Sequence, residues 1–311
     1  MNLLITGGFG HIGSHIINNI NKIKSIKKLY IIDYFYKNKP NSLFNLKKSI
    51  TKIFIINKDL SKRDSLKKFP KTDIVLHLAS MTDAEKSIEF SKEIYKNNIG
   101  IFENIIKYCE SNSSKLIHIS TTSVYGKLTG FLDEKLKKLE PQTPYAKIKL
   151  LEEKKLQKSK KINYISFRFG TIAGISPGMR FHTAVNKFCW QAVMEQPLTV
   201  WTTAYEQLRP YLDLSDAVRA MAFVIKNNIF DGNIYNVVTA NSTVKEVVEV
   251  IRQEVPELKV NFVEHEIMNQ LSYEVLNTRM EKSGFEAQGD IEKGIKDTIS
   301  LLKKSQSCMH N

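Results

Sequence analysis

Residues 2–13 read Asn-Leu-Leu-Ile-Thr-Gly-Gly-Phe-Gly-His-Ile-Gly, and this stretch decides the fold. Its apolar start predicts a short buried strand over residues 2–6, and isoleucines at helical spacing predict a helix directly after the glycines. Glycines between a strand and a helix allow a tight turn and the close approach of a pyrophosphate, whose charge the helix N-terminus stabilises. Gly7, Gly10 and Gly13 therefore predict a dinucleotide-binding turn, the alternative being a glycine-rich turn with a purely structural role.

The second predicted strand, Lys28–Asp33, ends in a carboxylate twenty residues after Gly13. A carboxylate at this place accepts hydrogen bonds from the adenosine ribose hydroxyls and repels a 2′-phosphate. Asp33 therefore favours NAD over NADP as the cofactor. Lys37 and Lys39 follow closely enough to leave NADP open as an alternative.

Strands and helices alternate through the first half of the chain. The strands are continuously apolar, as expected for a parallel sheet that helices cover on both faces. The prediction is an α/β fold with a doubly wound parallel sheet. After the first two strands, the predicted elements are a strand over Ile53–Asn57, a helix over Ser61–Phe69, a strand over Asp73–Leu78, a helix over Glu89–Cys109 and a strand over Lys115–Ser120.

The ends of these five strands should form one crevice. Sheets of this kind bind ligands beyond the carboxyl ends of their strands, where the connecting loops meet. The segments predicted at those ends are Gly7–Gly13, Asp33, Asp59, Ala79 and Thr121.

A possible proton-transfer site follows the fifth strand. Ser120–Gly126 is rich in hydroxyl side chains, and Tyr145 and Lys149 lie four residues apart on a predicted helix, so they share one face. In a chain so rich in lysine, a Tyr–Lys pair with this spacing also arises by chance. The position of the pair is what favours a functional role, because it follows Thr121 at a strand end and lies at the start of a helix that should pack on the sheet.

The second half of the chain changes character after Phe169. We expect a loop rich in glycine and proline there, then short helices and strands, and finally a strand that rejoins the main sheet. The predicted elements are a loop over Gly170–Arg180, a helix over His182–Met194, strands around Leu198–Trp201 and Arg209–Leu212, a helix over Ala217–Lys226 and a strand over Tyr235–Val237.

Composition narrows the class of protein. The 311 residues suffice for one large or two modest domains, and 42% hydrophobic with 25% charged residues is usual for a globular protein. The net charge of +14 comes mainly from scattered lysines, without the aromatic interleaving or reader motifs of a nucleic-acid-binding protein. We therefore expect no nucleic-acid partner, and a basic surface that attracts a small anionic substrate.

The cysteines and the apolar runs indicate a cytoplasmic location. Cys109, Cys189 and Cys308 are far apart and odd in number, which fits a reducing compartment and leaves no paired metal spacing. We expect no metal site. No run approaches the roughly 18 apolar residues of a membrane span, and the apolar N-terminus leads directly into glycines rather than into a signal peptide.

Several of these motifs, taken together and in order, resemble the extended short-chain dehydrogenase/reductase family. The likeness is to its nucleotide-sugar epimerases, dehydratases and dehydrogenases. It implies a Rossmann-type NAD-binding domain over residues 1–169, to which residues 204–240 return, and a smaller lobe, mainly residues 170–311, that binds a nucleotide-diphosphate sugar. It also implies a homodimer. The motifs are residues 6–13, 77–80, 98–100, 120–126 and 145–149.

The resemblance also implies a chemical role for the Tyr–Lys pair. Tyr145 would take the proton from a sugar hydroxyl, while hydride passes from the sugar C4 to the nicotinamide. A free tyrosine has a pKa of about 10, so Lys149 and the positive nicotinamide would have to stabilise the phenolate. Thr121 would share the substrate hydroxyl with Tyr145. Strand-end turn residues are the alternative interpretation of Thr121 and Ser123.

Further site residues are implied by the same resemblance. The cofactor would contact the glycine turn, the strand ends and the Tyr–Lys pair. In the lobe, Asn186 would bind the diphosphate, Arg209 would clamp it, and Val200 would lie in the segment that lines the nucleobase pocket. The remaining cofactor residues are His11, Ile12, Asp59, Leu60, Leu78, Ala79, Ser80 and Asn98, and the remaining substrate residues are Ser123 and Thr171.

Departures from the family pattern limit the assignment of the reaction. Dehydratases usually carry an Asp-Glu pair where this chain has Thr122 and Ser123, which argues against a 4,6-dehydratase. The family often has a second arginine that binds the phosphates, ahead of the C-terminal helix, and here only Arg279 could take its place. Our first interpretation is an NAD-dependent nucleotide-sugar 4-epimerase. The first alternative is a 4-dehydrogenase that releases the ketone, and residues 175–180 support it through a short likeness to enzymes that act on GDP-sugars. The next alternatives are a 4,6-dehydratase and then a non-catalytic dinucleotide-binding regulator.

Overall fold

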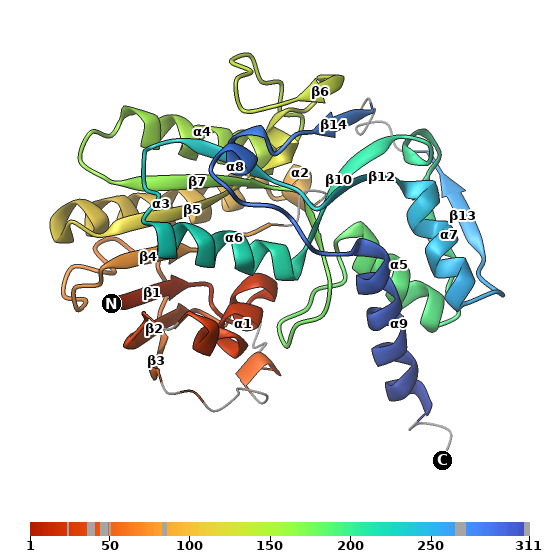
Figure 1. The fold of residues 1–311 in the computed structure, drawn as a ribbon, viewed down its shortest axis with the longest axis horizontal. Helices are drawn as coiled ribbons and strands as arrows, with labels where there is room; N and C mark the ends of the chain where they lie inside the picture. Colours follow the sequence, from red (N-terminus) through yellow and green to blue (C-terminus); the bar gives the residue numbers. More distant parts are fainter. Residues whose placement is uncertain are drawn as a thin grey trace.

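A seven-stranded parallel sheet forms the centre of the computed structural model (Figure 1). Its strands run in the order β3-β2-β1-β4-β5-β7-β11, so the chain winds outward from β1 in one direction and then from β4 in the other. The expected strand after residue 233 does rejoin the sheet, since β11 pairs in parallel with β7. The structure describes residues 1–23, 25–35, 41–43, 49, 51–82, 86–264 and 272–307.

The strand bounds match the predicted apolar runs closely, because most of the strands are buried on both faces and so do not show a regular alternation with polar residues. Only the outer strand β3 is largely exposed. The strands are β1 (Asn2–Thr6), β2 (Lys28–Asp33), β3 (Lys52–Asn57), β4 (Ile74–His77), β5 (Lys115–Thr121), β7 (Tyr164–Phe169) and β11 (Ile234–Val237).

Helices cover both faces of this sheet. Alternate residues of β1 point to opposite sides, so Leu3 and Ile5 belong to one core cluster and Leu4 to another. The first cluster includes α1 (His11–Asn18) and α6 (Leu214–Asn227), and the second includes α3 (Ser91–Asn112) and α4 (Pro144–Lys158). The doubly wound α/β fold predicted from the sequence is therefore confirmed.

A smaller group of elements has its own apolar cluster, away from the first strands of the sheet (Figure 1). Its helices pack against one another and against short strands from distant parts of the chain. Two further short strands, β6 (Gly130–Leu132) and β14 (Tyr273–Val275), pair beside them. The members of the group are α5 (Ala184–Val193), α7 (Val244–Glu254), α9 (Ile291–Ser307), β8 (Thr171–Ala173), β9 (Leu198–Trp201), β10 (Leu208–Asp213), β12 (Ala240–Thr243) and β13 (Val260–Val263).

Two predicted elements are wrong. Residues 61–69 form turns rather than a helix, because Asp64 adopts a left-handed conformation with φ of 55°, which no helix interior accommodates. The predicted loop over residues 170–180 begins with strand β8, which pairs in parallel with β10. The helix after this loop is also shorter than predicted.

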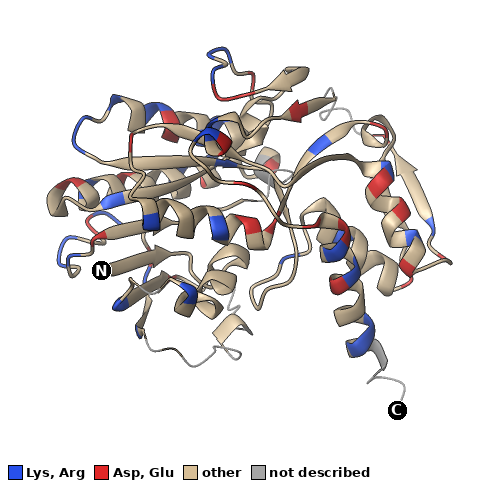
Figure 2. Ribbon diagram, viewed as in Figure 1, with Lys and Arg blue, Asp and Glu red and all other residues tan. Residues whose placement is uncertain are grey.

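Charges are spread over the whole fold. Figure 2 shows basic residues on most helices and loops, with acidic residues between them. In the described part of the chain, no helix is long and apolar enough to cross a membrane.

Candidate functional site

The glycine turn lies against the end of β4. Gly7 has φ of +67°, and a Cβ added there would lie 2.7 Å from the backbone of Ala79. A Cβ on Gly13 would lie 2.4 Å from the carbonyl oxygen of Gly8. Only glycine therefore permits this turn, and it brings the start of α1 close to the strand ends. A cradle of this shape fits the pyrophosphate of a dinucleotide.

Asp33 holds this turn from the end of β2. Its Oδ2 accepts a hydrogen bond from the backbone N–H of Phe9 at 3.0 Å, and its Oδ1 accepts one from Phe35 at 2.9 Å. A carboxylate has about four acceptor positions, so both oxygens can still accept ribose hydroxyls. Lys37 and Lys39, which left NADP open, lie outside the described residues.

Other predicted cofactor residues support the neighbouring loops. Thr6 Oγ1 lies 2.8 Å from His77 Nδ1 and accepts from the backbone N–H of Ala79 at 3.3 Å. Asn98 on α3 accepts from the N–H of Met81 at 2.9 Å and donates to its carbonyl at 3.1 Å. Asn98 thus fixes the segment after β4.

The remaining predicted cofactor residues lie around the same strand ends. Asp59 caps the turn after β3, where its Oδ1 accepts from the backbone N–H and the hydroxyl of Ser61. Leu60 is buried there, and Leu78, Ala79 and Ser80 follow β4. His11 and Ile12 open α1.

The hydroxyl groups after β5 hold one another. The Thr121 hydroxyl donates to Ser123 Oγ at 3.2 Å and accepts from the Ser123 backbone N–H at 3.2 Å. Thr122 points away from them, is buried, and donates to the carbonyl of Phe169. Thr121 and Ser123 therefore present two adjacent hydroxyls at this strand end.

Tyr145 and Lys149 lie on the first turns of α4. Pro144 occupies the first helical position, and Thr143 caps the helix by accepting from the N–H of Ala146 at 3.2 Å. Burial raises the pKa of Tyr145, and the positive charge of Lys149 opposes this rise. Burial alone would lower the pKa of Lys149, but the negative charge of Glu152 raises it overall. The lysine is thus held as an ammonium ion beside the phenol.

A buried polar network below Lys149 was not foreseen in the sequence. Lys149 Nζ donates to Glu152 Oε2 at 2.8 Å, and His118 Nε2 lies 2.9 Å from the same oxygen. His118 Nδ1 lies 2.8 Å from Ser166 Oγ on β7. The spacing of Lys149 and Glu152 on one helix face signals this pair, but burial of the carboxylate needs the packing of α4 on β5.

A second buried ion pair lies beside the first. Glu153 accepts two hydrogen bonds from the guanidinium of Arg168, at 2.9 and 2.7 Å, and a third from Ser120 at 2.5 Å. The Arg168 guanidinium also lies over the ring of Tyr125. This pair ties α4 to β7 and so fixes the helix that carries Tyr145.

The segment after β8 folds over the glycine turn. The backbone N–H of Gly178 donates to Ser14 Oγ at 2.9 Å, and Ser176 Oγ lies 2.8 Å from His11 Nδ1. A Cβ on Gly178 would lie 2.5 Å from the carbonyl oxygens of Phe9 and Gly10. The sequence predicted a loop here, but not this contact.

The predicted substrate residues are more dispersed. Asn186 is fully buried and donates to the carbonyl of Arg180 at 3.1 Å, and its buried Oδ1 has no partner among the residues that the structure describes. The Arg209 guanidinium lies over the ring of Tyr273 and donates to the carbonyl of Leu208. Val200 is buried within the apolar cluster of the small lobe, and Thr171 opens β8.

Arg279, the stand-in for a second phosphate arginine, is engaged elsewhere. Its guanidinium donates to the carbonyl of Ile234 and lies over the ring of Tyr235 on β11. Among the described residues, no three His, Cys, Asp or Glu side chains gather as a metal ion would require.

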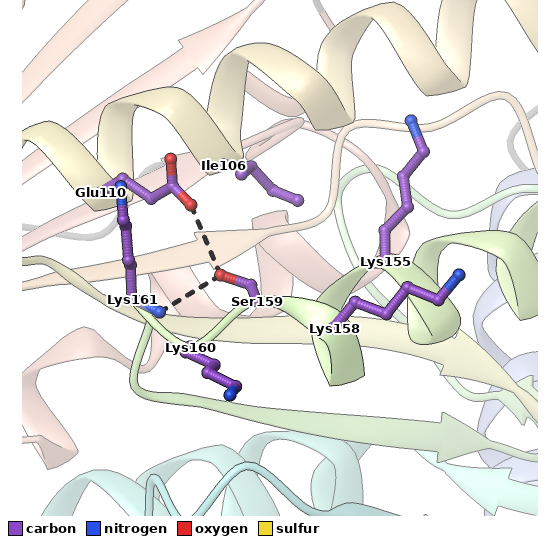
Figure 3. Close-up of a pocket in the computed structure, with 7 residues that line it drawn as sticks. All are labelled: Ile106, Glu110, Lys155, Lys158, Ser159, Lys160 and Lys161. Carbon is purple, nitrogen blue, oxygen red and sulfur yellow. Dashed lines mark hydrogen bonds between the residues drawn. The ribbon is translucent and has the colours of Figure 1, made fainter.

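A shallow open pocket lies between α3 and α4, near the C-terminal end of α4 (Figure 3). Ser159 donates to Glu110 Oε1 there at 3.4 Å, and the other polar lining residues are lysines. It contains none of the predicted site residues and lies at the opposite end of α4 from Tyr145. The pocket is therefore separate from the candidate site.

Solved structures share this fold over almost the whole chain. The dTDP-glucose 4,6-dehydratase of Streptomyces venezuelae, with NAD bound, has a TM-score of 0.88 at 19% identity and covers 99% of this chain and 98% of its own. The UDP-glucose 4-epimerase of Thermus thermophilus, in complex with NAD, has a TM-score of 0.83 at 20% identity and covers 97% and 99%. At these identities the likeness shows the fold.

Sequence relatives carry several activities. A trifunctional UDP-glucose 4,6-dehydratase/3,5-epimerase/reductase of Arabidopsis thaliana is 25% identical over 96% of this chain, which spans only 46% of the plant protein's length. An uncharacterized UDP-glucose epimerase of Bacillus subtilis is 29% identical over 76% of both chains.

The sequence model of the NAD dependent epimerase/dehydratase family matches residues 3–237, from β1 to the end of β11. The match spans the glycine turn, Asp33, Thr121, Tyr145 and Lys149. It confirms the resemblance given by the motifs and the expectation of NAD as cofactor. This chain belongs to the NAD-dependent epimerase/dehydratase family, and its sequence relatives include nucleotide-sugar epimerases and 4,6-dehydratases.

Proposed function

We propose that this protein is an NAD-dependent nucleotide-sugar 4-epimerase. The observation that carries the proposal is the position of the Tyr145–Lys149 pair and the Thr121 hydroxyl, which follow β5 at the same edge of the sheet as the glycine turn. A phenol, an ammonium ion and a hydroxyl can together remove the proton from a secondary alcohol. NAD, when bound, accepts the hydride from the sugar C4 and returns it to the ketone.

In this proposal, each residue near the reacting carbon has a separate task. Tyr145 holds and returns the proton of the C4 hydroxyl, while Lys149 stabilises the phenolate by its charge. Thr121 and Ser123 orient the sugar through their adjacent hydroxyls. Gly7, Gly10, His11, Ile12 and Gly13 hold the pyrophosphate, and the adenosine ribose binds to Asp33. Asp59, Leu60, Leu78, Ala79, Ser80 and Asn98 complete the cofactor site.

The small lobe supplies the nucleotide-diphosphate site. Among the described residues, the buried Oδ1 of Asn186 has no hydrogen-bond partner, and its Nδ2 donates to the carbonyl of Arg180. To bind the diphosphate, this Nδ2 would turn from the carbonyl to a phosphate oxygen, because only the amide N–H groups can donate. Arg209 would clamp the phosphates, and Thr171 and Val200 would lie in the segments that hold the sugar and the base. We place the lobe at residues 170–311, with 204–240 returning to the NAD-binding domain, and expect a cytoplasmic homodimer.

Two other fates of the 4-keto sugar use the same oxidation step. A 4-dehydrogenase would release the ketone, and a 4,6-dehydratase would expel the C6 hydroxyl. Thr122 is buried and Ser123 is a hydroxyl, so the acid that expulsion requires is missing at these two positions. This observation favours the epimerase over the dehydratase, although dehydratases occur among the relatives.

Incubation of the purified protein with UDP- and GDP-sugars separates these reactions. An epimerase gives the C4 epimer by NMR without net NADH, whereas a dehydrogenase accumulates NADH absorbance and a ketone. The Tyr145→Phe variant should bind NAD normally and turn over at least a hundredfold more slowly, on the order of a lost acid–base group. Unchanged turnover in this variant would remove Tyr145 from the mechanism.

A further inference from the structure

We propose that Glu152 is a positioning residue that holds Lys149 in place and sets the pH range in which the Tyr145–Lys149 pair exchanges its proton. The inference rests on the proposed function and extends it to a residue outside the predicted site. Glu152 lies one helical turn beyond Lys149 on α4 and faces the sheet.

The contacts of Glu152 are unusual for a carboxylate. Its Oε2 lies 2.8 Å from Lys149 Nζ and 2.9 Å from His118 Nε2, while its Oε1 is buried without a hydrogen-bond partner in the described part of the protein. The side chains of Lys149 and Glu152 are only 4% and 1% exposed. A buried ion pair of this kind often stabilises a fold no better than apolar residues would, so its presence suggests a role in the site.

Four further ionisable groups lie near the pair among the described residues. Tyr145 and Glu153 lie on α4, His118 on β5 and His77 on β4. Burial lowers the pKa of His77 to about 3 and also lowers that of His118, so both imidazoles are neutral near pH 7. Glu153 is paired with Arg168. The opposite charges of Lys149 and Glu152 therefore dominate the field at Tyr145.

These two charges act on Tyr145 in opposite directions. The Lys149 ammonium favours the phenolate, and the Glu152 carboxylate disfavours it. Glu152 also favours the protonated form of Lys149. Removing the negative charge of Glu152 therefore makes each deprotonation of the Tyr145–Lys149 pair easier, so both must move to lower pH, whichever group loses its proton first.

The test compares Glu152→Gln with Glu153→Gln, its neighbour on the same helix. Glutamine keeps the size and shape of each side chain and removes its charge, and its one oxygen still accepts hydrogen bonds while its amide nitrogen only donates. We expect both limbs of the pH profile of sugar oxidation to move down by about one pH unit in Glu152→Gln. Glu152→Asp, which restores the charge, should bring the profile back toward the wild type. Glu153→Gln should move the limbs less, because Glu153 is paired with Arg168 and its charge raises the pKa of Lys149 less than that of Glu152 does.

A second measurement needs no sugar. The tyrosinate absorbance of each apoprotein is followed against pH, and so is that of the same protein carrying Tyr145→Phe. The difference between the two curves reports the ionisation of Tyr145. This difference should titrate at lower pH with Glu152→Gln than with Glu153→Gln. A shift here without any sugar turnover would overturn the proposed function but support the role of Glu152. Identical titrations and identical pH profiles for the two variants, each folded by circular dichroism, would overturn the inference.

Discussion

At the scale of single residues, Asp33 combines an observed structural role with a proposed role in cofactor binding. It accepts hydrogen bonds from Phe9 and Phe35 and thereby shapes the glycine turn, and in the proposed function its remaining acceptor positions bind the adenosine ribose. Replacing Asp33 removes the turn contacts and, if the proposal holds, a ligand contact as well.

The Asp33→Ala variant should bind NAD about tenfold more weakly, since one or two hydrogen bonds to a charged acceptor are lost. NADP should lose less affinity, because the repulsion of its 2′-phosphate disappears at the same time. Calorimetric titration with both cofactors measures the difference. Asp73→Ala is a matched control, since Asp73 accepts from the N–H of Asn2 at the opposite end of β1. Equal losses for NAD and NADP would contradict the assignment of Asp33.

Residues with local signals could be predicted, and residues joined by tertiary packing could not. Asp33, Thr121 and Tyr145 each end a strand or begin a helix, so the sequence pattern itself locates them. The contact between His118 and Glu152 depends on how α4 packs on β5, and no periodicity reports that register. The same holds for the pair between Glu153 and Arg168.

At the scale of elements, the segment of residues 174–183 connects the glycine turn to the small lobe. Gly178 lies directly on the carbonyl groups of Phe9 and Gly10, and its N–H binds Ser14 on α1. This close contact is possible only because glycine has no Cβ. Strand β8 directly precedes this segment, but its three residues carry too little pattern for sequence analysis to separate them from a loop.

The Gly178→Ala variant should displace this segment, because the new Cβ would meet two carbonyl oxygens at 2.5 Å. We expect a loss of about 1–3 kcal/mol in the free energy of unfolding, as for other overpacked sites. NAD affinity should fall as well, since the glycine turn moves. Urea unfolding and NAD titration measure both effects. Gly294→Ala, on α9, is the control, because its added Cβ would lie 3.5 Å from Asp213 at the end of β10. This variant should keep both its free energy of unfolding and its NAD affinity.

At the scale of the whole molecule, the predicted parallel sheet forms because its inner strands are mostly apolar and are buried on both faces. The short strands of the small lobe pair across long stretches of chain, as β6 does with β14, and the sequence shows no sign of such partners. A consequence of the central sheet is that ionisable groups on its inner strands are buried. His77 on β4 and His118 on β5 are 2% and 0% exposed.

These histidines should make the fold sensitive to acid. The pKa of His77 falls from 6.5 to about 3 on folding because of burial, and that of His118 also falls. Below pH 6.5 the unfolded chain therefore binds protons that the folded chain does not, so stability decreases as the pH falls toward 3. Each histidine contributes up to about 1.4 kcal/mol per pH unit. Glu152, whose pKa falls to about 2, adds a further loss below pH 4.5.

Urea unfolding between pH 7 and 4 should thus show a free energy of unfolding that decreases steadily with pH. His77→Asn is the informative variant, because asparagine can still bind the hydroxyl of Thr6, the partner of His77 Nδ1, but cannot take up a proton. Its stability should depend less steeply on pH below 6.5, by the contribution of one histidine, even if its stability at pH 7 is lower. A slope equal to that of the wild type would mean that His77 takes up its proton in the folded protein as readily as in the unfolded chain. The inference that neutral imidazoles lie beside Lys149 and Glu152 would then be wrong.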